Sequence, residues 1–379
     1  MVSQKTEKGC VPKILHVISK VATPHNNTLM QALAASGSCT LRLYYSVKTM
    51  QQYSWGEGIF NAGSDPTVLG ECDVHWGLIG HALTHPGENY LFIGWPNNTA
   101  RMLLVILWFL RRPFLFWSDL PQETTNYPQH IAIIRKLMYH IVKTRAWRIF
   151  LVGRRTVEYF QRQGYSADRL VNLPIFVSLD SQRSDLSDKR TRIRAKYHAG
   201  AGTLLFASGS RLTFTKGFDV LIKAAVASRN RATRSFKVVI VGQGEQQTAL
   251  RQQIAEYGLN DTVVMEPWMA PMEFEALIAS ADVYIHPARF DAFGGGTLLA
   301  MALGVPVIGS DCAGAVIERV THGANGFIYP ADNAEKLAEY MLWCLNNRNS
   351  LSALGENARK TAEEWPPERG AQLIVDALR

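Results

Sequence analysis

Residues 291–297 bring a carboxylate, three consecutive glycines and a hydroxyl together in one short segment. The segment follows the apolar run Val283–Ile285, which predicts a strand, and leads into an apolar helix that we expect to open at Thr297. Glycines let a backbone approach a ligand closely, and the free N–H groups at a helix start favour an anion. Asp291 would repel a phosphate, so we expect it to hold hydroxyl groups of the molecule that carries the phosphate. The combination indicates a sugar nucleotide.

Two cations stand in the segment GSRLTFTKGFD, residues 209–219, which also follows a predicted strand. Arg211 and Lys216 are suited to neutralise a diphosphate leaving group, and Arg211 can do so with a bidentate fork. Such cations contribute most where charge develops on a departing group. A solvated Arg and Lys on a surface turn would show the same spacing, so both interpretations stay open.

Two further loops follow predicted strands. Gly242 and Gly244 lack the third glycine of a dinucleotide fingerprint, and they predict a tight strand-to-helix turn that keeps a cleft open. Trp268, at the end of another predicted strand, is either a core residue or the border of a site for a nucleotide base.

The elements that carry these residues alternate between strand-like and helical stretches, which is typical of α/β proteins with parallel sheets covered by helices. After Pro174 a polar, highly charged stretch over residues 178–197 interrupts the pattern. The two series predict two doubly wound Rossmann-like domains, with a ligand between them at the carboxyl ends of the strands. The predicted strands lie near residues 14–18, 41–45, 90–93, 114–117 and 149–152, and then near 204–207, 238–241, 263–265, 283–285, 305–308 and 326–329.

Composition restricts the class of protein further. The chain has 379 residues and a formal net charge of +8, and its length allows two ordinary domains. Five scattered cysteines without a CxxC pair argue against zinc sites and disulfides, and the start lacks a signal-peptide pattern, so we expect a cytoplasmic protein. His75, His81 and His85 are not spaced as a metal signature, so we expect loop and core histidines.

Residues 111–155 carry nine basic residues against two acidic ones, which suits an anionic membrane surface or nucleic acid. No nucleic-acid motif accompanies them, so we expect no nucleic-acid partner. The apolar run 102–110 is shorter than the roughly 20 residues of a spanning helix, and it is either a buried helix or a segment that touches lipid. The predicted helix 131–146 has apolar and basic faces, which fits peripheral membrane contact or a solvated basic face.

In their order along the chain, the motifs resemble those of the retaining, glycogen-synthase-like glycosyltransferases of the GT-B fold, family four, or glycosyl transferases group 1. They are GSRLTFTKGFD, IVGQGE, SADVYIHPARFDAFGGGTLLAMALGVPVI and AGAVIERVTHGANGFIYP, followed by a last helix with Trp365. The resemblance covers most of residues 200–375, and the first half is only compatible with the family. It implies an acceptor-side domain over residues 1–177, a linker over 178–200, a donor-binding domain over 201–362 and a C-terminal helix over 363–379 that crosses back.

The resemblance also implies roles for individual residues. Arg211 and Lys216 match the pair that grips the donor diphosphate, and the amides of Gly294–Thr297 match those that meet the phosphates. Asn26 and Asn27 stand where the family often has a glycine pair. From these matches and from the chain's departures from the family pattern together, we expect the catalytic residues to be Asp291, Asp119, Arg211 and Lys216, with no metal. We expect the donor-binding residues to be Arg211, Lys216, Gly242, Trp268, Phe293, Gly294, Gly295, Gly296, Thr297, Leu298, Glu318, Asn26 and Asn27.

The chain departs from the family pattern at its carboxylate pair and at its cleft histidine. Asp291 occupies the first carboxylate position, but the second holds Leu299, which cannot accept a hydrogen bond from a ribose. One charge-assisted hydrogen bond is worth roughly 1.5–3 kcal/mol, so its loss would weaken binding without abolishing activity. Asp119 follows Ser118 where the family has a histidine. It is either a replacement that contacts the donor sugar or the acceptor hydroxyl, or an N-cap or turn residue before Pro121.

The sequence therefore predicts a metal-independent enzyme that moves a sugar from a UDP- or GDP-sugar to an acceptor hydroxyl with retention of configuration. The basic, apolar surface expected over residues 102–155 suggests a lipid-linked or surface glycan as acceptor, reached by peripheral contact with the cytoplasmic face of an anionic membrane. The alternative is a non-catalytic GT-B relative that acts as a subunit or binding module. Because Arg211, Lys216 and the glycine segment are retained, we prefer the enzyme.

Overall fold

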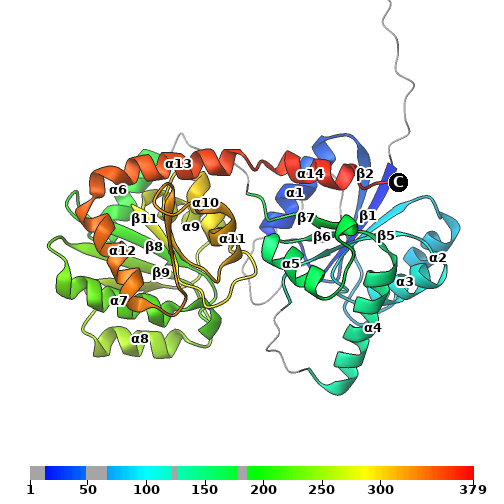
Figure 1. The fold of residues 1–379 in the computed structure, drawn as a ribbon, viewed down its shortest axis with the longest axis horizontal. Coiled ribbons are helices and arrows are strands. Elements are labelled where there is room, and N and C mark those ends of the chain that lie inside the picture. Colours follow the sequence, from blue (N-terminus) through cyan, green and yellow to red (C-terminus); the bar gives the residue numbers. More distant parts are fainter. Residues whose placement is uncertain (1–12, 48–65, 122–126, 178–185) are drawn as a thin grey trace, which may run out of the picture.

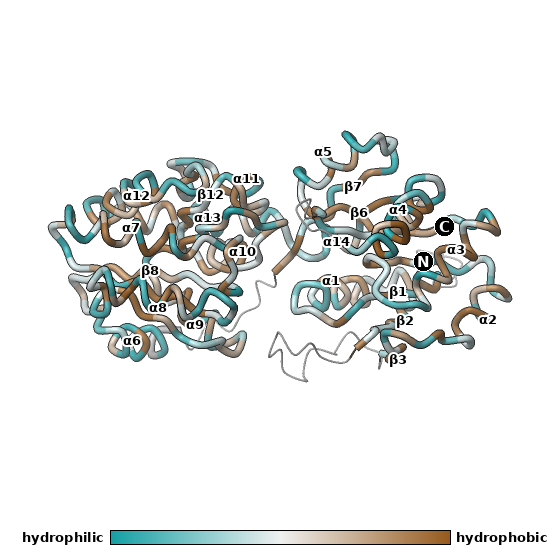
Figure 2. Tube along the Cα trace, turned by 90° about the horizontal axis from the view of Figure 1, so that it is seen from below, coloured by the Kyte–Doolittle hydropathy of each residue, from teal (hydrophilic) through white to brown (hydrophobic). Residues whose placement is uncertain are grey.

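The computed structural model describes residues 13–47, 66–121, 127–177 and 186–379, which form two parallel sheets covered by helices (Figure 1). The first sheet has seven strands in the order β3-β2-β1-β4-β5-β6-β7, and the second has six in the order β10-β9-β8-β11-β12-β13. Figure 2 shows that the chain folds into two lobes, with β8 and β12 in one and β1, β2, β3, β6 and β7 in the other. This architecture is the predicted pair of doubly wound α/β domains.

The elements follow the predicted alternation closely. The first domain contains β1 (Lys13–Ser19), α1 (Pro24–Ala35), β2 (Cys39–Tyr45), β3 (Thr67–Val68), α2 (Trp76–Thr84), β4 (Asn89–Ile93), α3 (Asn98–Phe109), β5 (Phe114–Ser118), α4 (Gln129–Arg145), β6 (Ala146–Leu151), α5 (Arg154–Arg162) and β7 (Leu170–Asn172). The second contains α6 (Leu186–Lys196), β8 (Leu204–Gly209), α7 (Phe218–Arg231), β9 (Phe236–Val241), α8 (Gln247–Glu256), β10 (Val263–Glu266), α9 (Pro271–Ser280), β11 (Val283–His286), α10 (Gly295–Ala302), β12 (Val307–Ser310), α11 (Gly314–Arg319), β13 (Gly326–Tyr329), α12 (Ala334–Asn346) and α13 (Leu351–Glu363), after which comes α14 (Pro367–Val375). Among the strands of the described residues, the sequence missed β3 and β7, because strands of two and three residues are too short to show a periodicity.

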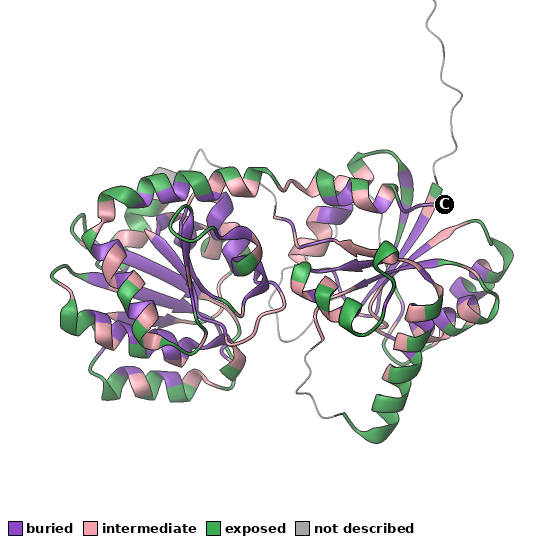
Figure 3. Cartoon of the chain, viewed as in Figure 1, coloured by how far each residue is buried: buried purple, intermediate pink, exposed green. Residues whose placement is uncertain are grey.

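The central strands are buried on both faces, as Figure 3 shows, which explains why their sequences are almost continuously apolar. Phe92, Phe116 and Phe206 are among the large side chains that are fully buried there. In each sheet the strand order reverses beside the first strand of the domain, β1 or β8. The carboxyl ends of the strands at such a reversal border a crevice.

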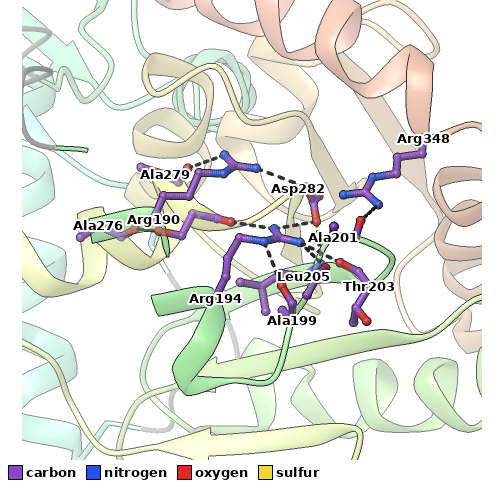
Figure 4. Close-up of polar contacts among 12 residues, drawn as sticks. Arg190, Arg194, Ala199, Ala201, Thr203, Leu205, Ala276, Ala279, Asp282 and Arg348 are labelled. Carbon is purple, nitrogen blue, oxygen red and sulfur yellow. Dashed lines mark hydrogen bonds and ion pairs between the residues drawn. The ribbon is translucent and has the colours of Figure 1, made fainter. Parts of the chain in front are cut away.

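The charged stretch after the first domain contains α6, which is held against the second domain (Figure 4). Arg194 donates a hydrogen bond to the carboxylate of Asp282 at 3.0 Å, and Arg190 donates one to the carbonyl of Ala279 at 3.1 Å. Asp282 also accepts a hydrogen bond from the amide of Leu205 in β8 at 2.8 Å. The helix is therefore fastened directly to the sheet of the second domain.

The chain passes between the domains again near its end. α13 lies along the second domain, and α14 packs beside α1 of the first (Figure 1). Trp365 lies between the two helices, and the guanidinium groups of Arg319 and Arg369 lie 3.3 and 4.0 Å from its ring centroid. The prediction that Trp365 belongs to the last helix is wrong. Pro366 and Pro367 follow it, and a proline at the first helical position sets the start of α14 there.

Residues 102–110 are neither a fully buried helix nor a fully exposed segment, because one face of α3 is buried and the other is exposed. Leu103, Leu104 and Leu107 are buried, whereas Phe109 is 79% exposed. None of the helices in the described part of the chain combines the length and the hydropathy that a membrane span requires.

Candidate active site between the domains

A cavity of about 540 Å³ lies between the two domains, at the carboxyl ends of strands of the second sheet. The first domain contributes residues of α1 and Val177, and the second contributes the ends of β8 and β9, the loops after β8 and β10, and the first turns of α9 and α10. The lining residues are Pro24, His25, Thr28, Val177, Gly209, Ser210, Val241, Trp268, Met269, Pro271, Phe274, Glu275, Gly295, Gly296 and Leu299. The cavity therefore lies where doubly wound topology predicts a ligand.

Asp291 is the centre of a buried polar cluster next to the glycine segment. Its Oδ2 atom accepts a hydrogen bond from Nζ of Lys216 at 2.6 Å and lies 3.1 Å from Nε2 of His286. The other ring nitrogen of His286 lies 3.0 Å from the hydroxyl of Thr297. Burial alone would raise the pKa of Asp291, but the hydrogen bond from His286 and the charge of Lys216 outweigh it and hold that pKa below its usual range. Asp291 is therefore ionised at neutral pH.

The turn that carries Lys216 is braced from one side by Arg289. Both terminal nitrogens of Arg289 pair with the carboxylate of Asp219 at 2.7 Å, and one also donates to the carbonyl of Phe214 at 2.9 Å. Lys216 itself is buried, so it is not a solvated surface lysine. Arg211 differs from Lys216 in its burial, because it lies exposed on the loop after β8.

Steric demands explain all three glycines of the segment. α10 begins at Gly295, two residues earlier than predicted, because Gly294 adopts a φ of 107° and serves as the N-cap. A Cβ atom at Gly296 would lie 2.2 Å from the hydroxyl of Tyr284, and one at Gly295 would lie 2.5 Å from Nε2 of His25. Without side chains here, the first amides of α10 can approach an anion in the cavity.

His25 is a candidate residue that the sequence reasoning missed. It comes from the first turn of α1 and reaches the glycine segment across the cleft. Burial lowers the pKa of His25, opposed in part by a backbone hydrogen bond at Phe176 and by the charge of Asp291, so the ring is neutral at pH 7. The predicted residues Asn26 and Asn27 lie in the same turn and are half-buried. The one signal that pointed to His25 was its position next to them.

Asp119 follows β5, and its carboxyl group is influenced by the second domain. The side chain has accessible surface, yet desolvation by the surrounding protein raises its pKa, and the negative charge of Asp291 raises it further. Asp119 is not the N-cap of any helix in the residues that the structure describes. The two carboxyl groups are thus close enough for the charge of one to act on the other, although no hydrogen bond joins them in the described residues.

Gly242 serves close packing between two loops. A Cβ atom there would lie 1.9 Å from the carbonyl oxygen of Ser210, and one at Gly244 would lie 2.5 Å from that of Leu212. Ser210 and Trp268 do line the cavity. Trp268 is partly buried and borders the cavity, so it is not a fully buried core residue, and its contact with a nucleotide base stays a prediction.

Glu318, Phe293 and Leu298 lie where the two domains touch. The carboxylate oxygens of Glu318 accept hydrogen bonds from the amide of Arg154 and from the side chain of Asn172, both at 2.9 Å. Phe293 and Leu298 join the hydrophobic cluster of the first domain. These residues, for which the resemblance implied donor binding, connect the two domains in this structure.

The chain matches a family model and several curated proteins over about half its length. Residues 189–361 match the family described as Glycosyl transferases group 1. The chain is 31% identical over 221 residues to GDP-mannose-dependent alpha-(1-6)-phosphatidylinositol monomannoside mannosyltransferase of Mycobacterium tuberculosis, with 56% of each chain covered. It is 29% identical over 191 residues to D-inositol 3-phosphate glycosyltransferase of Pseudarthrobacter chlorophenolicus, with 50% of this chain and 45% of that one covered. The chain thus spans about half the length of these curated relatives.

Solved structures share the fold over nearly the whole chain. Anabaena Alr3699/HepE, solved in complex with UDP, superposes with a TM-score of 0.77 and 18% identity, over 97% of this chain and 99% of that one. WaaG, a glycosyltransferase involved in lipopolysaccharide biosynthesis, superposes with a TM-score of 0.69 and 16% identity, over 96% and 99% of the two chains. At such identities the likeness shows the fold alone, which is the predicted GT-B fold.

Proposed function

We infer that this chain, whose residues 189–361 match the family model of glycosyl transferases group 1, moves a sugar from a nucleoside-diphosphate sugar to an acceptor hydroxyl with retention of configuration. One observation carries the proposal. A buried lysine, an ionised aspartate and the open amides of a helix start converge beside one interdomain cavity, at Lys216, Asp291 and Gly295. These groups can hold a pyrophosphate together with the hydroxyl groups of a sugar.

The donor would lie against the second domain. Its diphosphate would contact Arg211, Lys216 and the first amides of α10, and its base would lie near Trp268. Lys216 has three N–H donors, so it can keep its bond to Asp291 and also donate to a phosphate oxygen. The cations and amides would then stabilise the charge that develops on the leaving nucleoside diphosphate. Asp291 would accept hydrogen bonds from the hydroxyl groups of the sugar.

Glu275 offers an acceptor for the ribose in place of the missing second carboxylate. Glu275 and Leu299 both line the cavity, from the neighbouring helices α9 and α10. Because Leu299 cannot accept a hydrogen bond, the proposal assigns the ribose hydroxyl groups to Glu275. The names of the relatives mention GDP-mannose and UDP, so donors with either base are the first to test.

The acceptor would approach from the first domain, near Asn26, Asn27 and Asp119. As the family resemblance implies, the acceptor oxygen bonds to the anomeric carbon on the face that the diphosphate leaves, and the leaving phosphate takes the acceptor proton. The protein contributes positioning, electrostatic preorganisation and closure of the cleft against water. No step of this transfer calls for a metal ion.

The surface of α4 supports a lipid-linked or surface glycan as acceptor. Ile133 and Leu137 are 67% and 47% exposed, and the basic residues Arg135 and Lys136 lie beside them. Figure 3 shows that the part of α4 projecting from the domain is largely exposed. The names of two similar proteins refer to a phosphatidylinositol mannoside and to lipopolysaccharide biosynthesis. We therefore propose peripheral contact of α4 with the cytoplasmic face of an anionic membrane.

Hydrolysis of the donor in the absence of an acceptor tests the proposed activity. Wild-type protein should slowly release free sugar from GDP-mannose or UDP-glucose, the donors named for similar proteins. Arg211→Ala should release it about tenfold more slowly, because one charge-assisted contact to the leaving group is lost. Arg234→Ala, a matched change at an exposed position of the second domain, should equal wild type. No release by wild type with any donor would favour the non-catalytic relative.

A further inference from the structure

A second cluster of polar side chains lies in the first domain, apart from the interdomain cavity. The Nε2 atoms of His16 and His81 each lie 2.6 Å from the same carboxylate oxygen of Glu88. All three atoms lie within 4.8 Å of one another. The transfer reaction proposed above uses none of these side chains, so the cluster needs an explanation of its own.

Three elements bring the cluster together. His16 lies within β1, opposite Tyr90 of β4, His81 lies in the last turn of α2, and Glu88 comes directly before β4. The cluster therefore joins the middle of β1 to the amino end of β4 in the first sheet, whereas the cavity borders carboxyl ends of strands in the second sheet. The side chain of His16 is fully buried, but those of His81 and Glu88 are 23% and 14% exposed. The partial exposure provides an entry path for a small ligand.

The two histidine rings are held in place by their neighbours. Nδ1 of His16 lies 3.2 Å from the hydroxyl of Tyr44, and the ring stacks on that of Tyr90 with centroids 4.6 Å apart. His81 stacks on His85 with centroids 4.0 Å apart. Metal-binding histidines usually have their second nitrogen held by a polar partner, which sets the tautomer and the ring orientation. Tyr44 is such a partner for His16.

We propose that His16, His81 and Glu88 bind one divalent cation of the zinc class, with water completing the coordination. Two imidazole nitrogens and one carboxylate oxygen form a donor set that suits Zn²⁺. Mg²⁺ and Ca²⁺ prefer shells of oxygen ligands, and this cluster offers a single carboxylate.

Binding requires only a small local rearrangement. Zinc bonds to nitrogen and oxygen are about 2.0–2.2 Å long, which puts ligand atoms roughly 3.4 Å apart in a tetrahedral site. In the present structure each Nε2 atom lies 2.6 Å from the carboxylate oxygen of Glu88. Because Glu88 is partly exposed and precedes β4, its carboxylate can move away from the two nitrogens by roughly 0.8 Å to admit the ion. Each neutral ring then carries its proton on Nδ1, and for His16 the hydroxyl of Tyr44 can accept that hydrogen bond. The ion would fasten β1, α2 and the start of β4, so its role would be stability.

This proposal departs from the expectation of loop and core histidines that bind no metal. That expectation rested on the spacing of His75, His81 and His85. Of these, His81 alone belongs to the cluster, while His16 and Glu88 come from two other elements 72 residues apart. A site assembled from a strand, a helix and a loop leaves no spacing signature in the sequence.

Cation binding by the tag-free full chain, freed of metal with a chelator, tests the proposal. One equivalent of Zn²⁺ should raise the midpoint of thermal unfolding by several degrees, whereas Mg²⁺ should leave it unchanged. His81→Gln and Glu88→Gln should each abolish this shift, and Tyr44→Phe should weaken Zn²⁺ binding about tenfold. His130→Gln, an exposed histidine of α4, should behave as wild type. Co²⁺ should give the visible absorption of a four- or five-coordinate ion.

The outcomes separate this site from the transferase proposal. Circular dichroism checks that each variant folds, and donor hydrolysis without added metal should be equal in wild type and His81→Gln. If wild type and His81→Gln bind Zn²⁺ with equal affinity, or if Co²⁺ shows only its hydrated spectrum, the proposal is overturned. The three side chains would then form a hydrogen-bonded network and nothing more.

Discussion

The Nζ atom of Lys216 lies 2.6 Å from Oδ2 of Asp291, so the cation assigned to the donor phosphate and the carboxylate assigned to the donor sugar form one ion pair. Both side chains are largely buried, with 10% and 15% of their surface exposed. Removing one member of a buried pair leaves an uncompensated charge, which costs about 3–5 kcal/mol. The pair therefore couples the stability of the second domain to its proposed chemistry.

Lys216→Met should lower the free energy of unfolding by about 3 kcal/mol, because Asp291 then loses its lysine partner and keeps only the weaker contacts to His286 and to the amide of Phe293 among the described residues. It should also slow donor hydrolysis about 100-fold, because a preorganised cation is lost from the leaving group. Adding Asp291→Asn should recover most of the stability but none of the hydrolysis. Urea unfolding and hydrolysis rates measure both effects, with Lys223→Met, an exposed lysine of α7, as the matched control. If the double variant regained hydrolysis, the proposed contact between Lys216 and the donor phosphate would be contradicted.

Asp119 should make the protein less stable as the pH rises through the pKa of its carboxyl group in the folded state. Burial, and to a smaller extent the charge of Asp291, raises the pKa of Asp119 above its value in the unfolded chain, about 3.9. Above that pH the folded protein binds more protons than the unfolded one, so this contribution to stability is lost as the pH rises through the folded pKa. Asp119→Asn should therefore raise the unfolding midpoint at pH 7 and leave it nearly unchanged below pH 4.

The same variant also tests whether Asp119 contacts the sugars. If it does, sugar transfer at pH 7 should fall about tenfold in Asp119→Asn, which corresponds to one charge-assisted hydrogen bond. An Asp119→Asn protein that is more stable and equally active would identify a turn residue without a role in transfer.

Glu318 is expected to act through the contact between the domains. Both of its carboxylate oxygens already accept hydrogen bonds from the first domain, at Arg154 and Asn172. Glu318→Gln and Asn172→Ala should therefore slow transfer to a similar degree, and each should change the Kd of UDP or GDP by less than about threefold. Calorimetry measures the Kd. A tenfold weaker Kd in Glu318→Gln alone would instead support the nucleotide contact that the family resemblance implies.

Membrane contact through α4 should depend on both its charges and its apolar side chains. Wild-type protein should sediment with anionic liposomes at low salt, and reversal of Arg135, Lys136 and Lys143 to Glu should release it. Each basic residue near such a surface contributes about 1 kcal/mol, so the triple variant should lose at least about two decades of binding. Ile133→Ser should weaken binding without changing its dependence on salt.

The control for the liposome experiment is a triple charge reversal on the second domain, at Lys223, Arg234 and Lys360, which are all exposed. This variant should sediment as wild type does. If wild type stays in the supernatant, or if both triple variants are released alike, α4 is not the membrane contact.

The fold could be predicted from the sequence because its determinants are local. Apolar runs, helical spacing and glycine turns mark both Rossmann-like halves, and the cavity follows from where parallel strands end. The same holds for Lys216, Asp291 and the glycine segment, since all three follow strands of a single domain. The start of α10 at Gly295 differed from the prediction, because the backbone conformation of Gly294 cannot be read from its residue type.

The remaining site residues could not be predicted, because they are brought together from distant parts of the chain. His25 reaches the glycine segment from the other domain, and both partners of Glu318 come from β7 and α5 of the first domain. His286 is the last residue of the buried strand β11, so its sequence context suggests a core residue. Its contacts to Asp291 and to Thr297 of α10 become visible only when the packing of β11 and α10 is known. Such contacts are set by how the sheets and domains pack, so only the structure reveals them.

A crystal structure of the protein with UDP or GDP tests the central claim most directly, namely that a pyrophosphate binds between two cations and the start of a helix. We predict phosphate oxygens within about 3 Å of the Arg211 guanidinium, of Nζ of Lys216 and of the amides of Gly295 and Gly296. A nucleotide bound elsewhere, or a cavity that stays empty at saturating nucleotide with Arg211 and Lys216 turned away from it, would contradict the account.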